Sequence, residues 1–110
     1  MVRTALTMLV HLLTAPIVSE TVEVERRGPV ELTRFECRDI NRSSIVQRVC
    51  YDRQQRHLLV ATKGRYNQYC NVPADLFEAL MAAPSMGQFF NRSIRGDDSG
   101  RLACRTHDPL

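Results

Sequence analysis

The chain has 110 residues, the size of a single domain, of which 44% are hydrophobic and 25% charged. These ordinary globular values exclude a collagen-like or disordered chain, and the short, interrupted apolar stretches exclude a multi-span membrane protein. The formal net charge of +3 is too small to require a nucleic-acid partner by itself.

An uncharged and mostly apolar stretch covers residues 4–18, with Arg3 before it and Ser19 and Glu20 after it. A basic start, an apolar stretch and a small residue at the cleavage point are typical of a secretory signal peptide. The stretch is shorter than the roughly 20 apolar residues of a transmembrane helix. We therefore predict a signal peptide over residues 1–19 and a periplasmic or secreted bacterial protein. An amphipathic N-terminal helix of a cytosolic protein is the alternative.

Residues 20–42 are predicted to form an N-terminal extension. Glutamates dominate residues 20–36, and Gly28 with the proline after it marks a turn. Val22 and Val24 alternate with charged residues. A short edge strand and a flexible arm are both consistent with this pattern.

Three strands are predicted in the middle of the chain, at Ser44–Tyr51, His57–Thr62 and Arg65–Asn71. A polar turn at residues 52–56 joins the first two strands. Lys63–Gly64 forms a compact turn between the second and third, because glycine tolerates a positive φ. Together these segments predict a three-stranded antiparallel meander.

Two helices are predicted after the meander. Pro73 suits the first position of a helix, and Pro84 ends that helix. Ser85 with Gln88 three residues later is a capping-box pattern that starts a second helix, which ends at Gly96. The apolar stripes of the two helices consist of Leu76, Phe77, Leu80 and Met81, and of Met86, Phe89, Phe90 and Ile94. The predicted fold class is therefore α+β, with two short helices packed on one face of the meander.

Four cysteines, Cys37, Cys50, Cys70 and Cys104, follow one another at intervals of 13, 20 and 34 residues. An even number in a small exported chain predicts two disulfides, whereas four free thiols would suit a cytosolic chain. No CxxC occurs, and no histidine has metal-site spacing to a cysteine, so we predict no metal site and no cofactor.

The pairing of these cysteines stays open among three possibilities. Cys50 and Cys70 lie on the first and third predicted strands. Next-nearest strands are about 9.5 Å apart, which exceeds the ~7 Å Cα separation that a disulfide spans. A Cys50–Cys70 bond is therefore disfavoured if the strands follow chain order. Otherwise Cys37 fastens the N-terminal extension to the domain, and Cys104 fastens the polar tail at residues 97–110.

An ordered series of short motifs runs from residue 43 to residue 96. Its members are Ser43–Ser44, Tyr51–Asp52, Tyr69–Pro73, Ala83–Gly87, Phe89–Asn91 and Ile94–Gly96. In this order they resemble the KTSC domain, a small bacterial module that also occurs at the C-terminus of some lysyl-tRNA synthetases. The cysteine-bearing flanks are similar to a secreted four-cysteine bacterial subgroup of that family. The chain departs from the family's central Tyr-x-Tyr, because Asn67 replaces the first tyrosine and Tyr66 precedes it.

The synthetase context of the family implies RNA binding as an alternative function. Such an interface needs cations for phosphates and exposed aromatic rings for bases. The candidates are Tyr69, Arg48, Arg65, Asn91, Arg92 and Arg95. The competing structural interpretation is that Arg48 and Arg65 solvate an open sheet face while Tyr69 packs in the core. An anionic polymer of the cell envelope is a further hypothesis, which uses the same arginines.

No residue pattern supports catalysis. His57 and His107 form no visible pair with a nucleophile, and Ser43 and Ser44 have no local base. We therefore predict a small exported binding module that is not an enzyme, is stabilised by two disulfides and takes an unidentified ligand.

Overall fold

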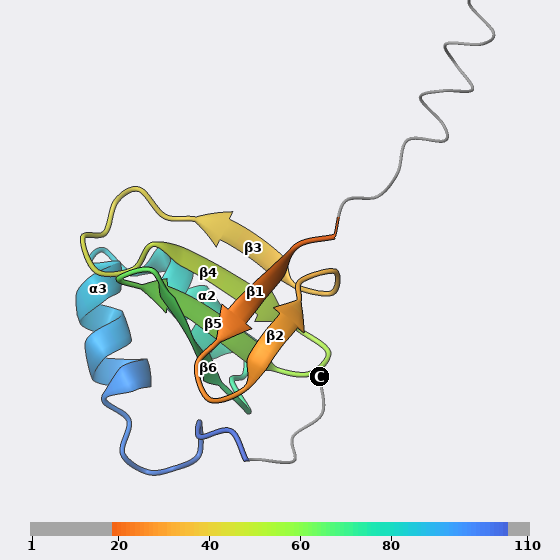
Figure 1. Ribbon diagram of the computed structural model, residues 1–110. Coiled ribbons are helices and arrows are strands. Elements are labelled where there is room, and N and C mark those ends of the chain that lie inside the picture. The colour runs from red at the N-terminus through yellow and green to blue at the C-terminus, as the bar shows by residue number, and fades with distance from the viewer. Residues whose placement is uncertain (1–18, 106–110) are drawn as a thin grey trace, which may run out of the picture.

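The computed structural model describes residues 19–105, which form a curled sheet with helices on one side (Figure 1). The strands are β1 (Thr21–Val24), β2 (Gly28–Glu31), β3 (Glu36–Asp39), β4 (Arg48–Asp52), β5 (His57–Thr62) and β6 (Arg65–Tyr69). The helical segments are α2 (Ala74–Ala82), α3 (Met86–Phe89) and the π-helix η1 (Phe90–Arg95). Apart from Ser19, the predicted signal peptide lies outside the described residues, as do the last five residues of the tail.

The predicted three-stranded meander is wrong as a description of the whole sheet. Six strands are hydrogen-bonded in the order β2-β1-β6-β5-β4-β3, and the sheet is mixed because β1 runs parallel to β6. The N-terminal extension supplies the additional three strands. Its alternating valines are buried while the glutamates between them face solvent, and Arg26 takes a positive φ of 66° in the turn between β1 and β2. The strand interpretation of Val22 and Val24 is therefore correct, and the extension contributes β1, β2 and β3 to the sheet.

The meander itself is present as β4, β5 and β6, and β5 has the predicted bounds. Strand β4 begins at Arg48, four residues later than predicted. The reason lies in Ser43, whose hydroxyl accepts hydrogen bonds from the backbone N–H groups of Ile45 (3.2 Å) and Val46 (3.1 Å). These bonds hold the preceding residues in a bend, so they do not extend the strand.

Both predicted helices form, with differences at their ends. Pro73 is the N-cap residue of α2, and the Ser85 side chain caps α3 by accepting from the Gln88 N–H at 3.4 Å. Helix α3 continues directly into η1. A Cβ atom on Gly87 would lie 2.9 Å from the Ile45 Cδ1 atom, so the segment before β4 packs closely against α3 at this glycine.

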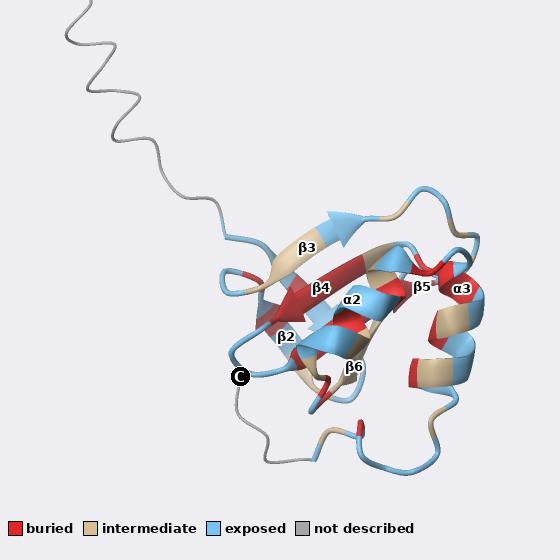
Figure 2. Cartoon of the chain, turned by 180° about the vertical axis from the view of Figure 1, so that it is seen from behind, coloured by how far each residue is buried: buried red, intermediate tan, exposed pale blue. Residues whose placement is uncertain are grey.

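The helices cover one face of the sheet, which we call the helix face (Figure 2). Its buried core joins Val49, Tyr51, Leu58 and Val60 of the sheet to Phe77, Leu80, Met86, Phe90 and Ile94 of the helical segments. The Tyr51 ring stacks on Phe77 with 4.3 Å between ring centroids, and its hydroxyl donates to the Val72 carbonyl at 2.6 Å. The prediction that both helices pack on one face of the sheet is confirmed.

The opposite face, which we call the hairpin face, has a core of its own. The β1–β2 hairpin lies across β4, β5 and β6 on this side (Figure 1). The buried residues there are Val22, Val24, Val30, Leu32, Cys50 and Leu59, with Phe35, Cys37 and Tyr66 packed against them. The sheet is therefore buried on both sides.

Both predicted disulfides are present, as Cys37–Cys50 and Cys70–Cys104. Their Cα–Cα distances are 4.0 Å and 4.9 Å. Strand β5 lies between β4, which carries Cys50, and β6, which ends just before Cys70. This is the strand order on which the argument against a Cys50–Cys70 bond relied. Each bond fastens one arm of the chain to the meander. Within residues 19–105, no helix has the length and hydrophobicity needed to cross a membrane.

Candidate functional site

A cleft of about 1080 Å³ lies between four segments that are distant in the sequence. The turn after β1, strand β6, the end of η1 and the tail at residues 97–105 form its walls. The side chains of Asn67, Gln68 and Tyr69 line it from β6, and Cys104 lines it from the tail. Segments from both arms and from the central domain therefore meet at one place.

The cleft is positively charged. Its arginines are Arg26, Arg27, Arg65, Arg95 and Arg105, against the carboxylates of Glu25 and Asp97. The Glu25 carboxylate lies 3.9 Å from the Arg65 Nε atom. Arginine is suited to such a site, because its planar guanidinium can bind phosphate or carboxylate groups in a bidentate way.

Asp97 reduces this positive charge but is turned toward its own loop. One carboxylate oxygen accepts the Ser99 N–H at 3.0 Å, and the other accepts from the Arg101 Nε at 2.9 Å. Hydrogen bonds from Ser99 and Arg101 lower the pKa of Asp97 to about 2. Asp97 therefore stays ionised at neutral pH while its oxygens are occupied by partners outside the cleft lining.

Three of the residues predicted as binding candidates meet in the cleft, namely Tyr69, Arg65 and Arg95. Asn91 and Arg92 are exposed and lie outside its lining. The Asn91 side-chain oxygen accepts a hydrogen bond from the Arg95 guanidinium, which also lies 5.2 Å from the centre of the Phe90 ring. The Asn91 side-chain oxygen therefore holds the Arg95 guanidinium in place at the edge of the cleft.

Arg48, the remaining binding candidate, joins three segments on the hairpin face through its side-chain contacts. Its guanidinium pairs with Glu20 at 2.6 Å and Asp39 at 3.2 Å, and it donates to the Tyr66 hydroxyl at 3.2 Å. The Glu20 and Tyr66 hydrogen bonds raise the pKa of Arg48, and the Arg48 hydrogen bond lowers the pKa of Glu20. The expectation that Arg48 solvates an open sheet face is therefore wrong, because the hairpin covers that face.

Tyr69 has two environments. Its ring packs edge-on against Phe90 at 5.8 Å on the helix face, while part of the side chain lines the cleft. Burial raises the pKa of its hydroxyl. Tyr66 lies on the opposite side of β6, under the hairpin, so the two tyrosines do not form one stacking surface.

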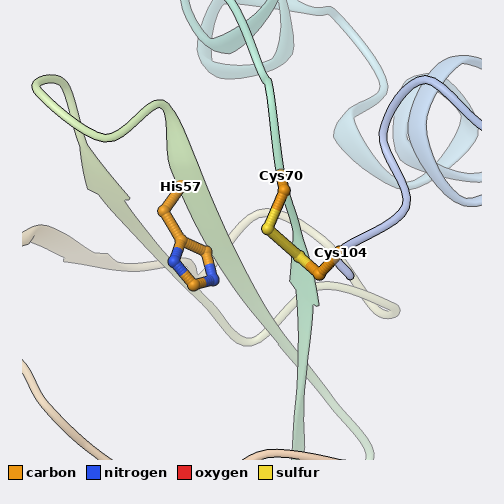
Figure 3. Close-up of side chains that lie close together, drawn as sticks. All are labelled: His57, Cys70 and Cys104. Atoms are coloured by element: carbon orange, nitrogen blue, oxygen red, sulfur yellow. A yellow bond between two sulfur atoms is a disulfide. The ribbon is translucent and has the colours of Figure 1, made fainter. Parts of the chain in front are cut away.

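One group of side chains was missed by the sequence interpretation. The His57 imidazole is only 2% exposed and lies beside the Cys70–Cys104 disulfide (Figure 3). A ring nitrogen of His57 and the Sγ atoms of Cys70 and Cys104 all lie within 4.8 Å of one another. The His57 Nε2 atom is also hydrogen-bonded to the Gln68 side-chain oxygen at 2.9 Å.

The sequence contains a signal for this group. The two-residue turn at Lys63–Gly64 sets the β5–β6 register, which pairs Thr62 with Arg65 and Leu58 with Tyr69. One further step along the same register places His57 opposite Cys70. Arg26, Arg27 and Arg105 were missed for another reason, because they come from arms whose path over the domain has no local pattern.

Comparison with known proteins agrees with the fold. The family model of the KTSC domain matches residues 42–97, just over half of the chain and one residue beyond the predicted bounds at each end. The crystal structure of a KTSC domain protein from Yersinia pestis is similar, with a TM-score of 0.54 and 28% sequence identity. That similarity covers 57% of this chain and 89% of the Yersinia chain. No curated protein sequence matches the chain.

Proposed function

This chain belongs to the KTSC domain family, and from this premise we propose that it is an exported, non-catalytic binding module for an anionic polymer of the bacterial cell envelope. The arginine-lined cleft is the observation that carries the proposal. The Cys70–Cys104 disulfide holds the tail that forms one of its walls.

The charge and size of the cleft support a polymeric anion. Five guanidinium groups around one hollow favour phosphate or carboxylate groups, and the amide of Asn67 suits the hydroxyl groups of sugars. Small-molecule pockets usually enclose about 300–1,000 Å³. A cleft of about 1080 Å³ therefore has room for several charged units of a chain.

Export is supported by the disulfides and by the N-terminal end of the sheet. Disulfides form and persist in oxidising compartments such as the periplasm or the exterior of the cell. Glu20 would be the first residue after the predicted cleavage site. Its carbonyl accepts the Leu32 N–H at 2.8 Å, and its carboxylate pairs with Arg48. Cleavage after Ser19 would leave these contacts in place.

The intact mass of the protein recovered from its host tests export. We expect the loss of the first 19 residues and no thiol that can be alkylated before reduction. A full-length mass with four alkylated cysteines would contradict export and both disulfides.

The RNA-binding alternative required an open sheet face, and the hairpin covers the face that carries Arg48 and Tyr66. Tyr66 is packed under the hairpin, and Tyr69 is held against Phe90. Stacking on bases requires exposed rings on an accessible platform. Nucleic-acid binding stays a prediction, and RNA serves as the competing probe in the binding experiment.

The binding experiment uses the full chain with both disulfides intact. Fluorescence anisotropy would be measured with labelled poly(glycerol phosphate), polyglutamate and polyuridine. The double variant Arg26→Glu/Arg65→Glu should weaken binding of the phosphate or carboxylate polymer at least about tenfold, because two charge-assisted contacts become repulsive. Arg38→Glu/Arg92→Glu is the matched control, since it changes the net charge equally at exposed positions outside the cleft.

Two outcomes would contradict the proposal. Equal weakening by both double variants would show attraction by net charge alone, without a site. Tighter binding of polyuridine than of either acidic polymer, at the same salt concentration, would favour the nucleic-acid alternative.

A further inference from the structure

The two disulfides of the chain have different surroundings. Cys37–Cys50 joins neighbouring strands at the rim of the hairpin core. Cys70–Cys104 lies against the buried His57 ring (Figure 3), and Gln68 binds that ring from the adjacent position on β6. Among the described residues, only the second bond therefore has an imidazole beside its sulfur atoms.

Contacts other than the disulfide also hold Cys104 near Cys70. The Cys70 N–H donates to the Leu102 carbonyl at 2.8 Å, and the Leu102 side chain is buried in the helix face with 4% exposure. The Asn71 side-chain amide donates to the Arg101 carbonyl at 3.4 Å. The two sulfur atoms should therefore stay close when the bond between them is broken.

We propose that reduction of the Cys70–Cys104 disulfide creates a binding site for a divalent cation of the zinc class, with His57, Cys70 and Cys104 as ligands. Two thiolates and one imidazole are a ligand set that zinc prefers over magnesium or calcium. Tetrahedral coordination, with Zn–S bonds of about 2.3 Å, places two sulfur atoms about 3.8 Å apart. The group already fits within 4.8 Å, so the site needs only local separation of the sulfurs.

The chemical step is a thiol–disulfide exchange followed by metal binding. A dithiol reductant gives two electrons and two protons to the Cys70–Cys104 bond and becomes a disulfide itself. Each cysteine thiol then releases its proton when its sulfur binds the cation, and neutral His57 donates a nitrogen lone pair. Water would fill the fourth position, while the Gln68 side-chain oxygen stays bonded to the His57 Nε2 atom.

The charge balance of this site suits its burial. An isolated thiolate at Cys70, which is 6% exposed, would be costly because water cannot solvate it there. Two thiolates and one divalent cation are neutral together. The same pocket therefore accepts either a disulfide or a metal ion without leaving an unpaired charge.

Cobalt titration of the full chain tests the proposal, because Co²⁺ replaces zinc and absorbs light when bound by thiolates. The protein is reduced with a phosphine, since a dithiol would itself bind the metal. We expect one Co²⁺ per chain, with thiolate-to-cobalt charge-transfer absorption and the visible bands of tetrahedral cobalt. The oxidised chain should give neither signal, and Cys37→Ser/Cys50→Ser should keep both.

Substitution of His57 gives the sharper test. His57→Gln should weaken Co²⁺ binding at least about tenfold, with circular dichroism confirming that the variant is folded. Unchanged affinity in His57→Gln, or cobalt binding that survives in Cys70→Ser/Cys104→Ser, would overturn the proposal. Should His57→Gln fail to fold, X-ray absorption of the zinc-loaded, reduced wild-type chain decides the matter. Two sulfur ligands with nitrogen support the site, and four sulfur ligands refute it.

Discussion

The two faces of the sheet are buried by different means. Among the described residues, the hydrophobic core of the helix face holds twelve buried residues, including the large side chains of Tyr51, Phe90 and Leu80. The hydrophobic core of the hairpin face holds six, of which Cys50 is one partner of a disulfide. Nearly all of the first core lies within the family-matched residues 42–97, whereas the hairpin that covers the second lies before them.

This difference indicates what the extension adds to the domain. The matched region already supplies one complete layer of sheet and helices. The extension then closes the other face with short strands, one disulfide and the ion pairs of Arg48 with Glu20 and Asp39. The helix face therefore depends mainly on packing, and the hairpin face depends more on cross-links and polar contacts.

A matched pair of leucine truncations tests this contrast with the largest expected effect. Leu80→Ala removes a side chain with no exposed surface and should lower the free energy of unfolding by about 4 kcal/mol. Leu32→Ala, at 6% exposure in the smaller core, should cost about 2 kcal/mol, because its site can relax more. Urea unfolding of both variants provides the measurement. Equal losses would mean that the two cores are packed alike.

Removal of each disulfide comes next in size. The chain-entropy model gives about 4 kcal/mol for Cys70–Cys104, which closes 34 residues, and about 3 kcal/mol for Cys37–Cys50, which closes 13. Paired alanine variants, unfolded without reductant, measure both values. We expect Cys37→Ala/Cys50→Ala to increase amide exchange mainly in β3. Protection of β3 equal to that in the wild type would show that the disulfide is not what holds this edge strand.

Local patterns account for the part of the fold that the sequence could predict. Strand β5 is a continuous apolar run between a polar turn and Lys63–Gly64, so both of its ends could be assigned. Strand β1 offers only Val22 and Val24, and its partner β6 lies about forty residues later. A parallel pairing of that kind is decided by tertiary packing and has no local signal.

The same limit applies to the site. Tyr69, Arg65 and Arg95 belong to predicted elements, and the structure places all three at the cleft, while binding of a ligand there stays a proposal. Arg26 and Arg105 reach the cleft only because the two arms fold back onto the domain. Sequence periodicity describes one element at a time, so it cannot show where such arms lie.

One polar contact on each face of the sheet is expected to contribute less to stability than the changes above. Tyr51→Phe leaves the buried Val72 carbonyl without its 2.6 Å hydrogen bond and should cost about 2 kcal/mol. Arg48→Met keeps an apolar stem but leaves two carboxylates that already face water, so it should cost about 1 kcal/mol. Chemical unfolding at low and high salt distinguishes the Tyr51 hydrogen bond from the Arg48 ion pairs. Only the Arg48 contribution should shrink with salt, and a salt-sensitive Tyr51 effect would contradict this assignment.

The smallest predicted effect is that the two faces lose stability at opposite ends of the pH scale. Arg48 lowers the pKa of Glu20 below its usual 4.5, so this contact stabilises the fold above pH 4.5 and is lost as the pH falls. Burial raises the pKa of Tyr69 above its usual 10.0, so the stabilisation from its neutral form is complete below pH 10 and is lost as the pH rises.

Urea midpoints measured across both pH ranges, for the wild type and for Glu20→Gln and Tyr69→Phe, isolate the contribution of each residue as a difference. Glu20→Gln should reduce only the acid-side loss, and Tyr69→Phe only the alkaline-side loss. If Glu20→Gln leaves the acid side unchanged, the ion pair between Glu20 and Arg48 does not stabilise the hairpin face, and the disulfide and the apolar core must do so.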